Sequence, residues 1–66
     1  MDMIPDLNIW RAANLLIQQH GQDAEIVAAQ RAHQMLERED YEVRGVWLRI
    51  RRAVAELQAV PTRRAH

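Results

Sequence analysis

The sequence predicts an all-α fold, a small three-helix bundle with helices at about residues 7–20, 24–38 and 41–58. Three observations support this. Alanine, leucine, glutamine, glutamate and arginine dominate the 66 residues, and all five favour helices. Apolar residues recur at steps of three and four, which is the spacing of one helix face. Glycine and proline occur only twice each, so few positions interrupt a helix.

Turn signals set the limits of the first predicted helix. Pro5 precedes Asp6, whose carboxylate can accept from the first free backbone N–H groups of a helix. Gly21 is expected to end this helix, because glycine adopts a left-handed backbone conformation at low cost. Leu15 points away from the apolar face and has no expected partner within the chain.

The second helix is predicted to be thin and the third to follow almost directly. Asp23 is its expected N-cap, and alanines fill its inner face, which lets neighbouring helices approach closely. Residues 39–40 are the whole connection, with Asp40 as the next N-cap. No proline separates the two helices, so one long fused helix is an open alternative. Pro61 is expected at or just beyond the end of the third helix.

The predicted core joins the apolar faces of the three helices. Its two tryptophans carry the largest apolar area. Residues 1–60 form one expected domain, followed by a basic tail at residues 61–66. The predicted core consists of Ile9, Trp10, Ala13, Leu16, Ile17, Ala28, Ala32, Met35, Leu36, Val43, Val46, Trp47, Ile50, Val54 and Leu57.

The residue types present argue against catalysis. Serine and cysteine are absent and Thr62 is the only threonine, so a nucleophile of either kind has almost no candidate. The lack of cysteine also excludes disulfides and thiolate metal sites. His20 and His33 lie on different predicted helices, without a partner at the spacing typical of metal ligands. We therefore expect no enzyme activity, cofactor or metal site.

Charge is balanced overall but unevenly placed. Residues 1–42 carry eight acids against three arginines, whereas residues 43–66 carry six arginines against Glu56 alone. Such asymmetry can orient a self-pair or attract an acidic partner. No segment has the length of apolar sequence that a membrane span needs, and the N-terminus does not read as a secretion signal. These patterns favour a cytoplasmic protein.

A second face of the third predicted helix suggests an interaction surface. It carries an aromatic residue and a leucine flanked by arginines, which are types common at interface hot spots. The alternative is a set of scattered apolar surface residues of the ordinary kind. We predict that this strip binds a protein partner, most simply a second copy. The predicted partner-binding residues are Tyr41, Arg44, Leu48, Arg51, Arg52 and, on the first helix, Leu15.

Nucleic-acid binding is the alternative function. The run V-W-L-R-I-R-R at residues 46–52 resembles the V-W-F-Q-N-R-R run of homeodomain recognition helices. It departs at Ile50, which stands where that family has its adenine-reading asparagine. The basic N-terminal arm of the family is replaced by Asp2 and Asp6. The arginines that would form a basic patch are Arg44, Arg49, Arg51, Arg52, Arg63 and Arg64.

A second resemblance covers most of the chain. The runs I-W-R-A-A-N-L-L-I, H-G-Q-D-A, A-A-Q-R-A and V-W-L-R-I-R-R-A-V-A-E-L resemble a group of short, uncharacterised bacterial helical proteins with a domain of unknown function. The H-G-x-D-A turn at residues 20–24 and the W-x-R-I run at residues 47–50 are the clearest landmarks. The resemblance implies a bacterial cytoplasmic protein and brings no activity, cofactor or catalytic residue.

Overall fold

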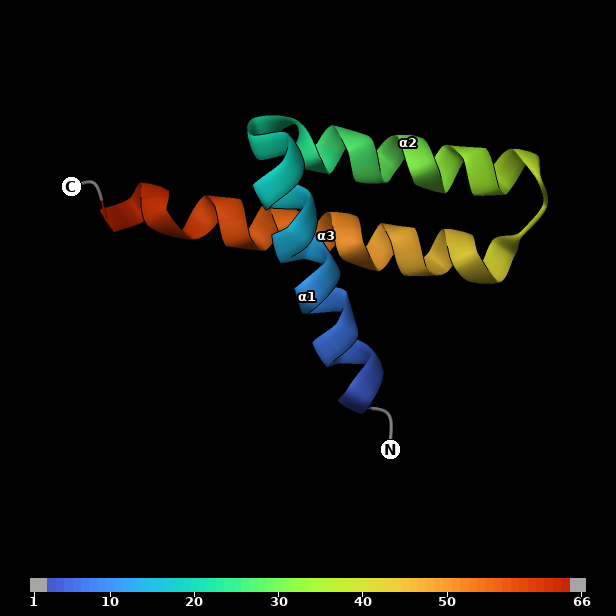
Figure 1. The fold of residues 1–66 in the computed structure, drawn as a ribbon, viewed down its shortest axis with the longest axis horizontal. Coiled ribbons are helices and arrows are strands. Elements are labelled where there is room, and N and C mark those ends of the chain that lie inside the picture. Colours follow the sequence, from blue (N-terminus) through green and yellow to red (C-terminus); the bar gives the residue numbers. More distant parts are fainter. Residues whose placement is uncertain (1–2, 65–66) are drawn as a thin grey trace.

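The computed structural model confirms the all-α class. It describes the backbone of residues 3–64 and the side chains of residues 7–59. Helix α1 spans Met3–His20, the 3-10 turn η1 spans Gly21–Asp23, α2 spans Ala24–Glu37 and α3 spans Tyr41–Arg64 (Figure 1). No strand occurs within this described part of the chain.

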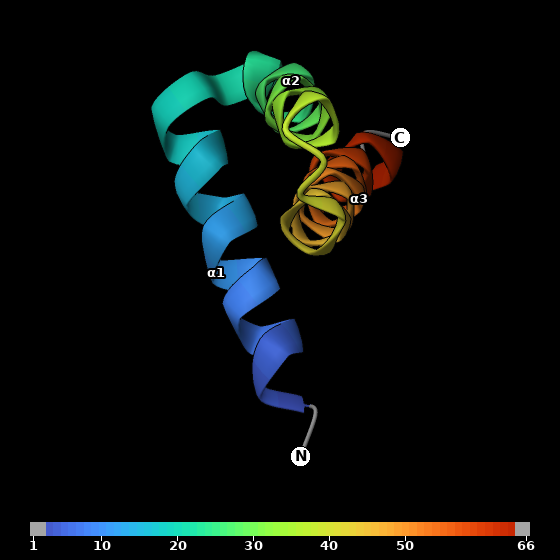
Figure 2. The same ribbon diagram turned by 90° about the vertical axis from the view of Figure 1, so that its right-hand side faces the viewer.

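The division into three separate helices holds only in part. α1, η1 and α2 follow one another without a non-helical residue, so residues 3–37 form one continuous helical stretch. The chain changes direction sharply at η1 (Figure 2). Residues 41–64 form the second stretch, and a short turn separates it from α2. The alternative in which the second and third helices fuse is therefore wrong.

The corner at η1 follows from Gly21. This residue has a φ of 59°, so the predicted left-handed glycine is confirmed. Asp23 is the N-cap residue of α2, as predicted, but its side chain makes no capping hydrogen bond, and the Ala24 N–H donates to the Gly21 carbonyl. The predicted cap at Asp6 is wrong, since α1 begins at Met3 and Asp6 lies inside it.

The turn between α2 and α3 is closed by backbone hydrogen bonds. The Asp40 N–H donates to the Met35 carbonyl at 2.8 Å, and the Glu39 N–H donates to the Leu36 carbonyl at 3.0 Å. This is the Schellman pattern of a helix C-terminus, with Glu39 in the left-handed region at a φ of 61°. Asp40 then caps α3, because its Oδ1 accepts from the Val43 N–H at 3.2 Å, as predicted.

Helix α3 is longer than the sequence suggested. It continues through Pro61 to Arg64, whereas the predicted end was residue 58. Residues 61–64 of the predicted tail are therefore helical, and residues 65–66 lie outside the described part. Proline lacks one N–H donor, and a missing donor near a helix end removes only a single intrahelical bond.

The helices are arranged as a hairpin crossed by a third segment. α2 and α3 run antiparallel side by side (Figures 1 and 2). α1 crosses α3 at a steep angle, toward the end of the hairpin where η1 lies. α3 is therefore the central element, because both other helices pack mainly on it. The molecule measures 44 × 29 × 17 Å, which is elongated for a chain of this length.

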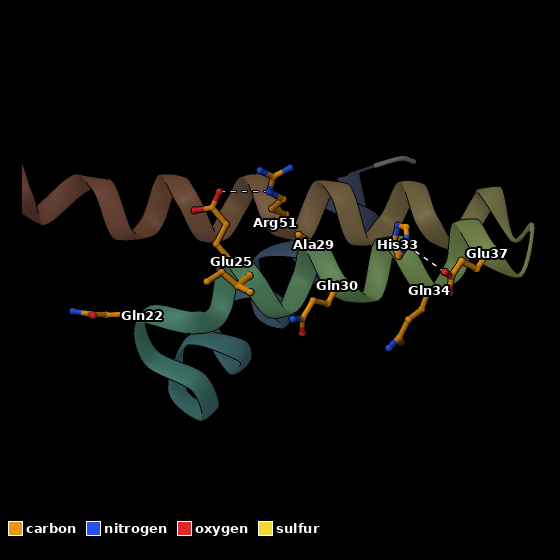
Figure 3. Close-up of a pocket in the computed structure, with 9 residues that line it drawn as sticks. Gln22, Glu25, Ala29, Gln30, His33, Gln34, Glu37 and Arg51 are labelled. Atoms are coloured by element: carbon orange, nitrogen blue, oxygen red, sulfur yellow. Dashed lines mark ion pairs between the residues drawn. The ribbon is translucent and has the colours of Figure 1, made fainter.

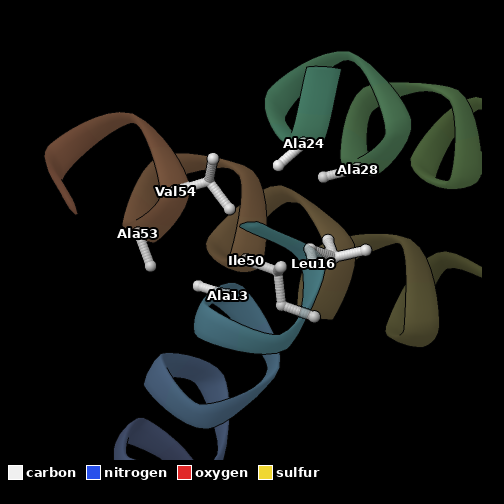
Figure 4. Close-up of a cluster of buried hydrophobic side chains, with 7 residues drawn as sticks. All are labelled: Ala13, Leu16, Ala24, Ala28, Ile50, Ala53 and Val54. Atoms are coloured by element: carbon white, nitrogen blue, oxygen red, sulfur yellow. The ribbon is translucent and has the colours of Figure 1, made fainter. Parts of the chain in front are cut away.

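Small side chains make up most of the core. Where α1, α2 and α3 meet, alanine predominates and Val54 is the largest fully buried side chain (Figure 4). Alanines let helix backbones approach closely, which is what a steep three-way crossing requires. The buried cluster consists of Ala13, Leu16, Ala24, Ala28, Ile50, Ala53 and Val54.

The predicted core is correct near this crossing and wrong farther away. Six predicted members are buried: Ala13, Leu16, Ala28, Ala32, Ile50 and Val54. Ile9, Ile17, Trp47 and Leu57 are partly buried against the cluster, and Met35 is half-buried. Trp10, Leu36, Val43 and Val46 are exposed. The reason is the steep crossing of α1 over α3. Because of it, the N-terminal half of α1 does not pack against the turn end of the hairpin, and the apolar side chains of both parts stay exposed.

Replacing Glu39 with glycine is expected to stabilise the fold by about 1 kcal/mol, because glycine removes the steric cost of the left-handed conformation. Denaturant unfolding followed by tryptophan fluorescence measures the change. Glu42→Gly is the control, since Glu42 lies in the first turn of α3 and should lose about 1 kcal/mol there. Destabilisation by both variants would contradict the proposed turn geometry.

Ala28→Leu is expected to lower the free energy of unfolding by about 1–3 kcal/mol, because the larger side chain must force the packed helices apart. The neighbouring Ala29→Leu is the control. Ala29 is only half-buried on the outer side of α2, so its change should stay within about 0.5 kcal/mol. Equal effects at the two positions would show that α2 packs through a different face.

Candidate functional site

An apolar stripe on α3 continues beyond the part that α1 covers. Ile50 and Val54 are buried where α1, α2 and α3 meet, but Val43 and Val46, nearer the turn, are 38% and 42% exposed. Leu36, on α2 across the turn, is 39% exposed, on the side of α2 that carries Glu25 and Ala29. We call Val43 and Val46 the distal surface, because they continue the α3 stripe toward the turn and away from η1. Two large apolar side chains beside a covered stripe form a candidate interaction site.

The seam between α2 and α3 is held beside this surface. The Arg31 guanidinium carbon lies 5.2 Å from the centroid of the Trp47 ring, a cation–π contact between α2 and α3. Trp47 is half-buried against the core. The arginine over its ring thus adds a contact between α2 and α3 at Trp47.

Two polar contacts hold the other end of the hairpin. The Gln58 side-chain amide donates to the Gly21 carbonyl at 2.9 Å, which ties α3 to the corner at η1. Glu25 Oε2 lies 3.5 Å from Arg51 Nε, joining α2 to α3. Both charged side chains are more than 40% exposed, so this ion pair contributes at most about 1 kcal/mol. These contacts fix the helix geometry that leaves the distal surface uncovered.

The predicted partner-binding strip is placed only partly as expected. Tyr41 is exposed at the start of α3, and Leu15 is exposed on α1, a different element. Leu48 and Arg44 are half-buried along α3. Arg52 is exposed and its Nε lies 3.6 Å from Glu56 Oε2.

Arg51, the remaining member of that strip, is committed to its ion pair with Glu25. The structure therefore does not gather the six residues into one free surface. Their role in binding stays a prediction.

The larger hollow lies along the outer side of α2. Its volume is about 760 Å³, and it is wide open to solvent (Figure 3). His33 Nε2 lies 3.3 Å from Glu37 Oε2 within it, as an exposed pair on adjacent turns. Its lining is Gln22, Glu25, Ile26, Ala29, Gln30, His33, Gln34, Glu37 and Arg51. With no hydroxyl or thiol in that lining, the hollow offers no nucleophile of either kind.

A smaller hollow lies between α1 and α3, with a volume of about 170 Å³. It combines an exposed indole with two arginines that approach from α3. Its lining is Ile9, Trp10, Arg49, Arg52, Ala53 and Glu56. Among the described side chains, no group of three or more histidine, aspartate or glutamate residues is placed to hold a metal ion.

No protein-family model matches the chain, and searches of curated proteins and of solved structures returned no significant match. The resemblance to short bacterial helical proteins therefore stays a prediction. Within residues 3–64, no helix combines the length and apolar character required to cross a bilayer.

Sequence reasoning missed the distal surface because it assigned both Val43 and Val46 to the core. Helical periodicity shows which face of a helix is apolar, but it does not show how far a neighbour covers that face. One signal was present. The stripe from Val43 to Leu57 is about 21 Å long at 1.5 Å per residue, whereas a helix crossing it steeply is only about 10–12 Å wide.

Leu36→Gln is expected to lower the free energy of unfolding by about 1 kcal/mol at low protein concentration, because 39% of Leu36 is already exposed. Leu16→Ala is the comparison, since Leu16 is 5% exposed and its truncation should cost about 2–5 kcal/mol. Thermal unfolding of dilute samples by circular dichroism measures both. A loss in Leu36→Gln as large as that in Leu16→Ala would mean that Leu36 belongs to the core.

Proposed function

We propose that this chain is a non-enzymatic helical interaction module that associates with itself through α3. The main support for this proposal is the apolar stripe of α3, because α1 covers only the half of it near η1. Monomeric proteins seldom leave a contiguous apolar surface without a partner. Among the side chains of residues 7–59, eight large apolar ones are more than a third exposed: Leu7, Trp10, Leu15, Ile26, Leu36, Tyr41, Val43 and Val46.

The size of the exposed surface supports this proposal. The accessible surface is 5123 Å². A compact monomer of 7.7 kDa is expected to expose about 4300 Å². The radius of gyration is 12.6 Å. A compact chain of this length would have a value of about 10.8 Å. The excess surface, roughly 800 Å², is the amount that each partner buries in a specific interface of ordinary size.

Stability gives a second reason for association. Chains of this length rarely obtain more than about 3–5 kcal/mol from a single core. Here the core is built mainly of alanines, and Val54 is the largest fully buried side chain. The sequence contains no cysteine that could add a disulfide. Burial against a second copy would stabilise the folded state by mass action. The resemblance to short bacterial helical proteins supports a bacterial cytoplasmic setting for this module.

Sedimentation equilibrium across a wide concentration range tests the proposal. The apparent mass is expected to rise from 7.7 kDa toward twice that value, because an apolar interface saturates at the dimer. Raising the salt concentration should change this association little. A constant mass of 7.7 kDa at all concentrations would contradict self-association.

Nucleic-acid binding is tested on the same samples. Binding to phosphates through the α3 arginines would show as a rise in anisotropy of a labelled oligonucleotide that falls steeply with salt. Salt-dependent binding without self-association would favour the nucleic-acid function instead.

A further inference from the structure

We propose that two copies of this chain associate by exchanging α1, so that the α1 of each copy packs on the α3 of the other, with Gly21 as the hinge. This inference rests on the proposed self-association and names the element that is exchanged. Exchange of an identical element is a low-cost route to a dimer, because the element makes the same contacts that it makes within one chain.

The corner at η1 is held in its bent form by the backbone of one glycine. Residues 3–37 are helical throughout, and within them only Gly21 has a positive φ, at 59°. His20 and Asp23 on either side keep negative φ values of −121° and −87°. The change of φ that opens the corner therefore falls mainly on Gly21. A helical Gly21 would join residues 3–37 into one helix about 52 Å long at 1.5 Å per residue.

The bent corner has few contacts of its own. Neither His20 at the start of η1 nor Asp23 at the start of α2 makes a side-chain capping hydrogen bond. The closed form is held by the Ala24 N–H and the Gln58 amide, which both donate to the Gly21 carbonyl. In one continuous helix, the backbone N–H groups after the corner would donate to carbonyls four residues earlier. Opening therefore replaces the corner's hydrogen bonds rather than only breaking them.

Helix α1 is attached to the hairpin by few side chains. Among its described side chains, at residues 7–20, only Ala13 and Leu16 are buried, and three others are partly buried against the cluster. Leu7, Trp10 and Leu15 are exposed, so much of the apolar surface of α1 lies outside the core. Opening breaks only this limited contact, and exchange restores it twice in the dimer.

The hairpin of α2 and α3 stays intact in this arrangement. The turn at Glu39 is the other left-handed position, but opening it would break the α2–α3 interface, which is the largest between the described helices. The corner at η1 is only three residues long, which reach about 10 Å even when extended. The corners of the two copies must therefore lie side by side, which places the two-fold axis at η1.

Gly21→Ala tests the hinge, because alanine disfavours the left-handed corner and favours a continuous helix. A Cβ at position 21 meets no atom within 4 Å, so the effect comes from backbone preference and not from a clash. The dimer dissociation constant, measured by sedimentation equilibrium, is expected to fall at least about tenfold. Gly45→Ala is the matched control, since Gly45 lies inside α3 and also has open space at its Cβ position. An equal effect at the two glycines would overturn the hinge.

Isotope-filtered NMR tests the exchange itself in the unmodified chain. Labelled and unlabelled copies are unfolded together, refolded and concentrated, and the contact between the Ala13 and Ala53 methyl groups is followed. Both residues belong to the buried cluster, Ala13 on α1 and Ala53 on α3 (Figure 4). Exchange places their contact between two copies, whereas a chain that keeps its own α1 makes it internally.

The mass of the same samples separates this inference from the proposed function. A dimeric mass with the Ala13–Ala53 contact between labelled and unlabelled copies supports both. A dimeric mass with this contact only within one copy would overturn the exchange and leave self-association intact, as expected if two copies pair through the distal surface. A mass of 7.7 kDa for the unmodified chain at every concentration would overturn both.

Discussion

The steep crossing of α1 over α3 is the constraint on which the rest of the structure depends. It is made at small side chains, with Ala13 from α1 beside Ala53 from α3, while Val54 of α3 points toward Ala24 of α2 (Figure 4). Gly21 sets the angle by taking the left-handed conformation at the corner, and Gln58 holds that corner by donating to its carbonyl. A helix that crosses in this way covers about two turns of its neighbour and leaves the remainder exposed.

The hairpin of α2 and α3 stays regular beyond the part that α1 covers, because it has contacts of its own. α2 and α3 pack along their full common length through buried alanines on α2, at positions 24, 28 and 32. The closed turn at Glu39 and Asp40 removes unsatisfied backbone groups at the far end without help from α1. The stacked pair of Arg31 and Trp47 adds a contact midway. The turn end is therefore ordered by the hairpin itself, so its apolar side chains are held in fixed positions.

Much of the fold could be predicted from the sequence, and the errors have one cause. Composition and the steps of three and four indicate the helices, Gly21 indicates the corner, and Asp40 indicates the start of α3. All of these are local signals. The angle between helices is not local, since it depends on how closely side chains from distant segments interlock. Val43 and Val46 share a face with Ile50, so periodicity assigns all three to the core, although α1 reaches only the last.

The predicted partner-binding strip shows that periodicity also misjudges residues that lie off the core face. The predicted strip was chosen because Leu48 lies off the core face, where an apolar residue has no evident role, yet Leu48 is half-buried along the hairpin. Val43 and Val46, which were assigned to the core face, are instead exposed. An apolar stripe that is longer than its cover makes specific association possible, because a partner extends packing that the chain has already begun. Scattered apolar residues on the opposite face would instead have to form a new interface from separate contacts.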